Sequence, residues 1–245
     1  MEKKDKIYLI VAIAFMLAVV VADICYIMVD CSQYITKTIA SALFVLCGAF
    51  NLVYVIKTKQ MSNRYFKWFM MLGLIFGALG DILLIDNFIV GTGLFALGHV
   101  FYVVAYCLLT KFNWKDLLFC IGAMAASLLV ILLGDFNFDG MLPVVIVYAI
   151  IISAMLGKAL GLLFTKKLNT LTKVIIIVGS CFFFFSDLML LFNVFGAERQ
   201  FILSVLCLAT YYPAQVLLAT SIYLVSKNTR EAELAQTKAS KQKLS

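Results

Sequence analysis

Two aspartates lie inside long apolar stretches of this sequence, and they are its first candidates for chemistry. Asp187 follows four phenylalanines in the run CFFFFSDLMLLF, and Asp81 lies in the run GLIFGALGDILLI. An apolar environment favours the protonated form of a carboxyl group, and a second carboxylate nearby makes it harder for both to ionise. One acid can then hold a proton at neutral pH while the other is ionised, which suits general acid–base catalysis.

Polar residues in other apolar stretches could support such a pair. His99 and Tyr102 are three residues apart, and Tyr211 and Gln215 are four apart, so each pair shares a helix face. A structural hydrogen bond is an equally reasonable role for the lone histidine. The remaining candidates for a supporting or substrate-binding role are Asp23, Lys37, Ser186 and Tyr212.

No motif for a metal or an organic cofactor accompanies these residues. One histidine cannot build a His-rich metal site. The sequence has no GxSxG, P-loop or HExxH pattern. We therefore predict no metal and no other cofactor.

The elements that must position these residues are membrane-spanning helices. The chain has 245 residues, of which 64% are hydrophobic and only 13% charged, whereas soluble domains are about 45–50% apolar. We predict an all-α, polytopic membrane protein in which each span needs about 20 apolar residues. The eight expected spans are 7–29, 38–56, 67–86, 88–110, 117–134, 141–164, 171–195 and 201–226.

The basic residues predict the orientation of these helices. Every Lys and Arg except Lys37, Lys158 and Arg199 falls on one side of the eight spans. This is the positive-inside pattern, and it places both termini in the cytoplasm. Membrane topology, and not nucleic-acid binding, therefore explains the net charge of +7. We expect Lys158, within its span, to extend its amine to the membrane surface.

The domain organisation follows from the same pattern. Residues 1–226 form one eight-helix transmembrane domain, and residues 227–245 form a basic cytoplasmic tail. Without signals for an organelle, we expect a multi-pass protein of a bacterial cell membrane. The sequence leaves the oligomeric state open.

Residues 67–106 align with residues 173–212 and suggest the hypothesis of an internal repeat. Lys67, Asp81 and Asn87 match Lys173, Asp187 and Asn193 in this alignment. The spans 67–86 and 88–110 would then correspond to the spans 171–195 and 201–226. At 1.5 Å rise per residue, the two aspartates differ in depth by about 5 Å, so they are able to face each other.

Five short pieces of the sequence carry a resemblance to a known family: TKT (36–38), GDILL (80–84), GHVFY (98–102), SDLML (186–190) and YYPAQVLLA (211–219). In these pieces the chain resembles the YhhN family, the lysoplasmalogenase-like integral membrane proteins. The pieces follow the family's order, and the resemblance covers most of the chain. One departure is that Lys37 is followed by Thr-Ile where the family pattern has Pro-Leu.

The resemblance implies a hydrolase that cleaves the vinyl ether bond of lysoplasmalogens. The products are a fatty aldehyde and glycerophosphocholine or glycerophosphoethanolamine. Asp81 and Asp187 would divide the roles of proton donor and stabiliser of an oxocarbenium ion, as two carboxyl groups do in glycosidases. His99, Tyr211 and Gln215 would orient water or hold the glycerol and phosphate, and Lys37 would bind the phosphate. The expected partners are this lysophospholipid and the membrane lipids.

Two other classes of protein use acids within membranes. Intramembrane aspartyl proteases carry GxGD, Tyr-Asp and PAL motifs, but here residue 78 is Ala, Ser186 precedes Asp187, and Pro213 begins PAQ. A proton-coupled transporter or a lipid-binding protein is the main alternative, since buried acids and repeats suit transport. Against it, the spans lack the helices broken by Gly and Pro that surround many transport sites.

Overall fold

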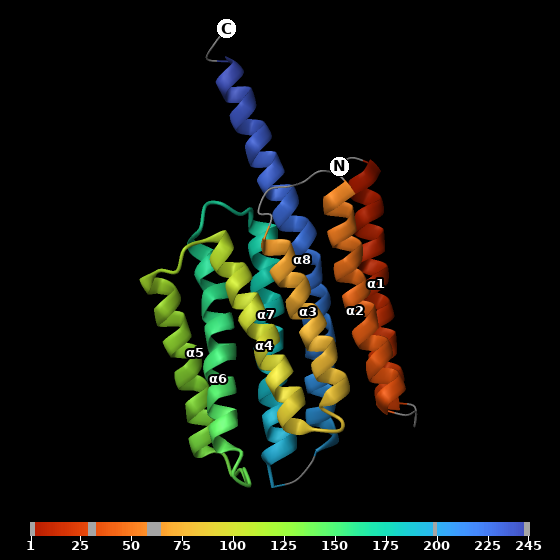
Figure 1. Cartoon of the computed structure of the whole chain (residues 1–245), viewed down its shortest axis with the longest axis vertical. Coiled ribbons are helices and arrows are strands. Elements are labelled where there is room, and N and C mark those ends of the chain that lie inside the picture. The colour runs from red at the N-terminus through yellow and green to blue at the C-terminus, as the bar shows by residue number, and fades with distance from the viewer. Residues whose placement is uncertain (1–2, 29–32, 58–64, 198–199, 243–245) are drawn as a thin grey trace.

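The computed structural model is a bundle of long helices and describes residues 3–28, 33–57, 65–197 and 200–242 (Figure 1). No strand is present in these residues, where an isolated β-bridge joins Phe136 and Gly196. The all-α prediction is therefore confirmed. The helices are α1 (Lys3–Met28), α2 (Gln33–Lys57), α3 (Phe66–Leu83), α4 (Phe88–Leu109), α5 (Trp114–Leu133), α6 (Leu142–Gly161), the short 3-10 helix η1 (Leu162–Phe164), α7 (Thr170–Phe195) and α8 (Phe201–Gln242).

Seven of the helices in the described ranges, α2 to α8, are long and apolar enough to cross a membrane. Large apolar side chains cover their outer surface, and Leu132 and Leu133 are 76% and 77% exposed. Such a surface is stable against lipid, where each helix satisfies its own backbone hydrogen bonds. In α1 the described apolar stretch, Ile10–Ala22, is shorter than a span. The eighth span therefore stays a prediction.

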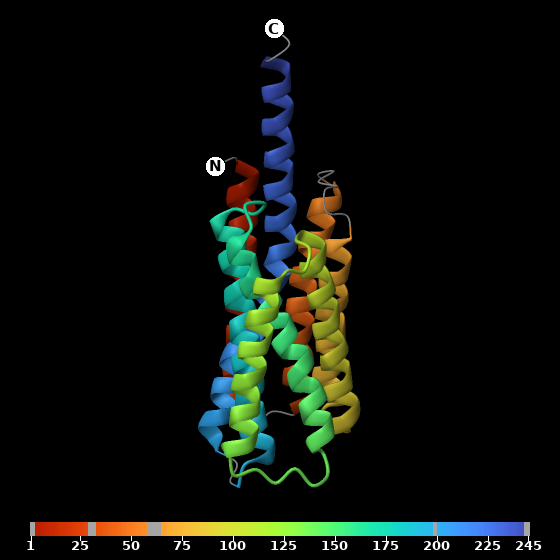
Figure 2. The same ribbon diagram turned by 90° about the vertical axis from the view of Figure 1, so that its left-hand side faces the viewer.

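Helix α8 packs against four others and lies at the centre of the site described below. It contacts α1, α2, α3 and α7. Helices α3 and α4 form one antiparallel pair, α7 and α8 form another, and α5 packs along α6 at the edge of the bundle (Figures 1 and 2). The start of α1 and the end of α8 lie at the same end of the bundle (Figure 1). The side of the membrane on which they lie and the internal repeat both stay predictions.

The segment that we expected to be a separate basic tail continues α8. The helix runs without a break from Phe201 to Gln242, through the predicted boundary at residue 226, and its last turns extend beyond the other helices (Figure 1). Residues 243–245 lie outside the described residues. The side chain of Asn228 anchors this helix to the loop before α7, because it accepts from the amide of Asn169 and donates to the carbonyl of Lys167.

Lys158 extends its amine to the segment between α4 and α5, as expected for a residue near the membrane surface, but its side chain is fully buried there. Its amine donates to Asp116 Oδ2 at 2.6 Å, to Thr110 Oγ1 at 3.0 Å and to the carbonyl of Lys111 at 3.1 Å. Asp116 is also fully buried and forms a capping box with Asn113 at the start of α5. The partner of Lys158 is therefore Asp116, an acid in the first turn of α5. The sequence analysis overlooked it because it directly follows basic loop residues.

Replacing Lys158 with Met should lower the free energy of unfolding by about 3–5 kcal/mol, because Asp116 keeps a buried, unpaired charge. Denaturant titration of the protein in detergent micelles measures this change. Adding Asp116→Asn to Lys158→Met removes that charge and keeps a side-chain oxygen for the capping box. The double variant should therefore regain most of the lost free energy of unfolding. The control is Lys166→Met on an exposed loop residue. A loss from Lys158→Met no larger than that of the control contradicts this role for the ion pair.

Candidate functional site

Asp81 joins three helices through hydrogen bonds to one carboxylate oxygen. Ser41 on α2 donates to Asp81 Oδ2 at 2.5 Å, and Tyr211 on α8 donates to the same oxygen at 2.9 Å. Asp81 itself lies near the end of α3 and is 6% exposed. These two hydroxyl hydrogen bonds replace bonds to water that a carboxylate loses when it is buried.

A chain of hydrogen bonds leads from α4 to this carboxyl group. Tyr102 donates to Gln215 Oε1 at 2.8 Å, Gln215 Nε2 donates to the Tyr211 hydroxyl at 3.1 Å, and Tyr211 donates to Asp81. Every proton in the chain therefore points toward Asp81. Hydrogen bonds aligned in one direction polarise and strengthen one another. The prediction that Tyr211 and Gln215 share a helix face is confirmed.

Glycines on α3 make room for this chain. A Cβ atom at Gly77 would lie 2.6 Å from Gln215 Nε2, and one at Gly73 would overlap the ring of Tyr102. Gly98 on α4 lies against the backbone of α3 at Gly73. Small residues at these positions allow α3, α4 and α8 to approach closely enough for their polar side chains to meet.

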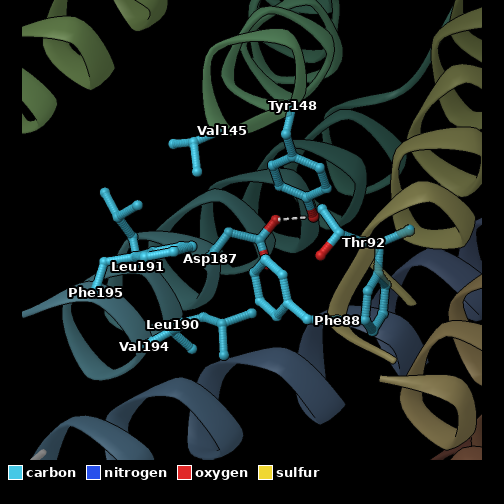
Figure 3. Close-up of a pocket in the computed structure, with 10 residues that line it drawn as sticks. Phe88, Thr92, Val145, Tyr148, Asp187, Leu190, Leu191, Val194 and Phe195 are labelled. Carbon is cyan, nitrogen blue, oxygen red and sulfur yellow. Dashed lines mark hydrogen bonds between the residues drawn. The ribbon is translucent and has the colours of Figure 1, made fainter. Parts of the chain in front are cut away.

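Asp187 lies in a more open environment than Asp81. Its side chain is 13% exposed, and its Oδ2 accepts one hydrogen bond, from the Tyr148 hydroxyl of α6 at 2.7 Å. Figure 3 shows this bond, with the carboxyl group surrounded by aliphatic and aromatic side chains. The second polar neighbour is His99 of α4, whose Nε2 lies 3.7 Å from the same oxygen.

The hydrogen bonding of His99 determines which ring nitrogen carries its proton. Nδ1 lies 2.7 Å from the carbonyl of Phe95, and a carbonyl only accepts, so Nδ1 is the donor. In the neutral ring Nε2 then has a free lone pair, and it has no hydrogen-bond partner among the described residues. Phe183 and Tyr148 pack edge-on against the ring, with centroids 4.5 and 5.5 Å away. His99 therefore presents a fixed base toward Asp187.

Aromatic rings separate the two carboxyl groups. Tyr211, which donates to Asp81, packs against Phe183 at 5.2 Å, and Phe183 packs against His99, which faces Asp187. The two carboxyl groups share no direct hydrogen bond, but they are close enough for an electrostatic interaction. The sequence predicted that the two acids are able to face each other. In the structure, the rings of Tyr211, Phe183 and His99 link the surroundings of the two acids.

An apolar cavity of about 50 Å³ leads away from Asp187 (Figure 3). It also contains Thr92 and Tyr148, and four of its apolar residues line a much larger vestibule of about 1060 Å³ at the end of the bundle. Lys37 lines this vestibule together with Asp86 and Asp139. The cavity beside Asp187 therefore adjoins a polar vestibule. The four residues common to both spaces are Phe88, Leu190, Val194 and Phe195.

Two predicted residues are not brought into this arrangement. Ser186 is buried, and its hydroxyl donates to the carbonyl of Phe183 in its own helix. Tyr212 is buried on the far side of Tyr211, against the rings of Tyr211 and Phe44. The side chain of Asp23 lies outside the described residues.

Sequence reasoning overlooked two of the hydrogen-bond donors. Ser41 lies four residues after Lys37 and therefore on the same face of α2, which was an available signal. Tyr148 is a lone hydroxyl within the apolar run VVIVYAIII, and an isolated polar group there needs a buried partner. In the ranges that the structure covers, no group of three or more His, Cys, Asp or Glu residues could hold a metal ion.

The fold and site together define a multi-pass helical membrane protein with the carboxyl groups of Asp81 and Asp187 inside its bundle. The family model described as the YhhN family matches residues 32–222, and the chain belongs to this family. The matched region includes both aspartates and every residue of the hydrogen-bonded chain. No curated protein and no solved structure matches the chain.

Gly77→Ala should displace Gln215 and thereby break the chain of hydrogen bonds that ends at Asp81. The expected loss is about 1–3 kcal/mol in the free energy of unfolding, because the added methyl group overpacks the interface of α3 and α8. The matched control is Gly93→Ala on α4, where a Cβ atom meets nothing within 4 Å. Denaturant titration in micelles compares the two variants, and equal stability would show that Gln215 does not depend on this glycine.

Proposed function

We propose that this protein hydrolyses the vinyl ether bond of lysoplasmalogens to a fatty aldehyde and a glycerophosphocholine or glycerophosphoethanolamine. The observation that carries the proposal is the position of Asp187. Its carboxyl group lies at the inner end of an apolar cavity, between a hydroxyl donor, Tyr148, and an imidazole lone pair, that of His99. The resemblance to lysoplasmalogenase-like proteins supports the choice of substrate.

The reaction needs an acid that can protonate carbon. In the first step, Asp187 gives its proton to the β-carbon of the vinyl ether, and the ether oxygen shares its lone pair to form an oxocarbenium ion. Water then attacks the carbon next to that oxygen and loses a proton, which returns to Asp187. The resulting hemiacetal releases the aldehyde and the glycerol hydroxyl, so the net reaction consumes one water.

The surroundings of the two aspartates favour Asp187 as the proton donor. Asp187 lines the cavity, whereas Asp81 lies behind Tyr211 and already accepts two hydroxyl hydrogen bonds. Those donors stabilise Asp81 as a carboxylate. A fixed negative charge near the cavity would stabilise the oxocarbenium ion electrostatically, without moving during the reaction.

His99 fits the role of guiding the attacking water. Its Nε2 lone pair lies 3.7 Å from Asp187 Oδ2. A water near both groups would donate a proton to His99 as it attacks, and His99 would then pass that proton to the ionised Asp187. This transfer restores the acid for the next turnover, and the Phe95 carbonyl keeps His99 in the required tautomer.

Asp187→Asn should lower aldehyde release by about 10²–10⁴-fold, because the amide cannot donate a proton to carbon. The measurement is aldehyde production by the purified protein in detergent with a lysoplasmalogen. Asp135→Asn, at an exposed acid outside the cavity, is the control and should keep the wild-type rate.

Full turnover by a folded Asp187→Asn variant would overturn the assignment of the proton donor. No aldehyde from the folded wild-type protein, with either choline or ethanolamine head groups, would overturn the substrate. Uptake into vesicles that depends on a proton gradient would then favour the proton-coupled transporter, the main alternative for a protein with buried acids.

Lys37 supports the assignment of a phosphate-bearing substrate. It lines the polar vestibule that adjoins the cavity beside Asp187, and it lies close enough to Asp81 for an electrostatic interaction. In this proposal, the phosphate of the lysolipid binds near the Lys37 amine, while the vinyl ether reaches Asp187.

Lys37→Met should raise KM for a lysoplasmalogen by about tenfold and leave kcat nearly unchanged, because one charged contact to the phosphate is lost. The matched control is a second substrate, a 1-alkenylglycerol, which has the same vinyl ether and no phosphate. Its KM should not change. An equal rise in KM for both substrates contradicts a phosphate contact.

A further inference from the structure

A second cavity of about 50 Å³ meets Asp187 from the side opposite the vestibule. It shares Val145, Tyr148, Asp187 and Leu191 with the first cavity but none of the four residues that line the vestibule. It is enclosed by α5, α6 and α7. The six residues that belong to this cavity alone are Ser127, Ile131, Ala149, Ile152, Phe184 and Leu188.

The second cavity offers almost no polar contact away from Asp187 and Tyr148. Its remaining hydroxyl, that of Ser127, donates to the carbonyl of Ala123 within α5. The other residues specific to it are aliphatic or aromatic. An occupant of this space is therefore apolar, in contrast to the vestibule with Lys37, Asp86 and Asp139.

The second cavity lies at the edge of the bundle, next to lipid. Helix α5 packs mainly along α6 and forms the outer wall (Figures 1 and 2). Its opposite face is turned outward, with Leu129 and Leu132 exposed. Phe184 and Leu188 of α7 are only partly buried. A long hydrocarbon chain that starts in this space can therefore continue into the bilayer.

We propose that the second cavity binds the start of the substrate's hydrocarbon chain and that Ala149 determines how bulky a chain it accepts. The inference rests on the proposed function. Two apolar cavities meet at one carboxyl group, and the first of them adjoins the polar vestibule, as a single-chain lipid requires when it is cleaved between its head group and its chain. The head group lies toward the vestibule, the chain lies between α5 and α7, and the scissile bond lies at Asp187.

Ala149→Phe tests the proposal by filling the second cavity, and Ile150→Phe is its matched control. Ile150 is the next residue of α6 and is 51% exposed, so its replacement changes only the lipid-facing surface. Two probes are used in micelles: an alkenyl lysolipid, followed by aldehyde release, and a saturated alkyl ether lysophosphocholine, followed by binding. Each probe is supplied with a straight octadecyl chain and with the same chain carrying a methyl branch near the ether.

Ala149→Phe should weaken binding and turnover of the branched probes by about tenfold relative to the straight-chain probes, because the ring fills the space that the first carbons of a bulky chain need. The control should keep the wild-type ratio. An unchanged ratio in a folded Ala149→Phe variant overturns the chain site while leaving the proposed reaction intact. Chain-dependent binding of the saturated ether without any aldehyde release supports the chain site and overturns the reaction.

Ile131→Ala provides a second variant, in case Ala149→Phe does not fold. It removes bulk from the α5 wall of the same cavity. A methyl-branched alkyl ether lysophosphocholine should then bind more tightly to the variant than to the wild type. Equal binding of the branched probe to both proteins contradicts the proposal.

Discussion

A carboxyl group inside a lipid-embedded bundle must find its hydrogen-bond donors within the protein, and the core of this molecule is organised around that constraint. Water is absent from the hydrocarbon region, and each unsatisfied polar group there costs several kcal/mol. Asp81 meets the constraint with hydroxyls from α2 and α8, and its chain of donors extends to α4. These contacts require glycines on α3, because larger residues there would keep the helices apart. Packing and polar contacts in this region therefore depend on each other.

Asp187 differs because its hydrogen bonding is incomplete. It accepts from Tyr148, faces an imidazole lone pair, and borders two cavities. The contrast between the two aspartates is the physical basis for dividing their roles. In the proposed reaction, a carboxylate held by two hydroxyl hydrogen bonds contributes a fixed charge, whereas a carboxyl group that borders a cavity can exchange a proton with a bound molecule. The aromatic layer of Tyr211, Phe183 and His99 keeps the two groups apart without removing their electrostatic interaction.

The sequence predicted the helices and the two acids more successfully than the partners of those acids. Long apolar runs predicted the class of fold, and the rarity of charge within them identified Asp81, His99 and Asp187. Helical spacing correctly paired Tyr211 with Gln215. The partners Ser41 and Tyr148 were overlooked because contacts between distant helices follow from tertiary packing, which spacing within one helix does not determine. The buried ion pair of Lys158 was overlooked for the same reason, since its partner Asp116 lies on another helix.

The most direct test of the central claim is hydrolysis of a lysoplasmalogen in heavy water, with the aldehyde trapped by reduction and analysed by mass spectrometry. Proton transfer to the β-carbon of the vinyl ether predicts one deuterium on the carbon next to the aldehyde group. It also predicts that the folded Asp187→Asn variant yields almost no labelled product. Aldehyde without this deuterium would show that the bond is broken by another route. Equal labelling by the variant would show that Asp187 is not the acid.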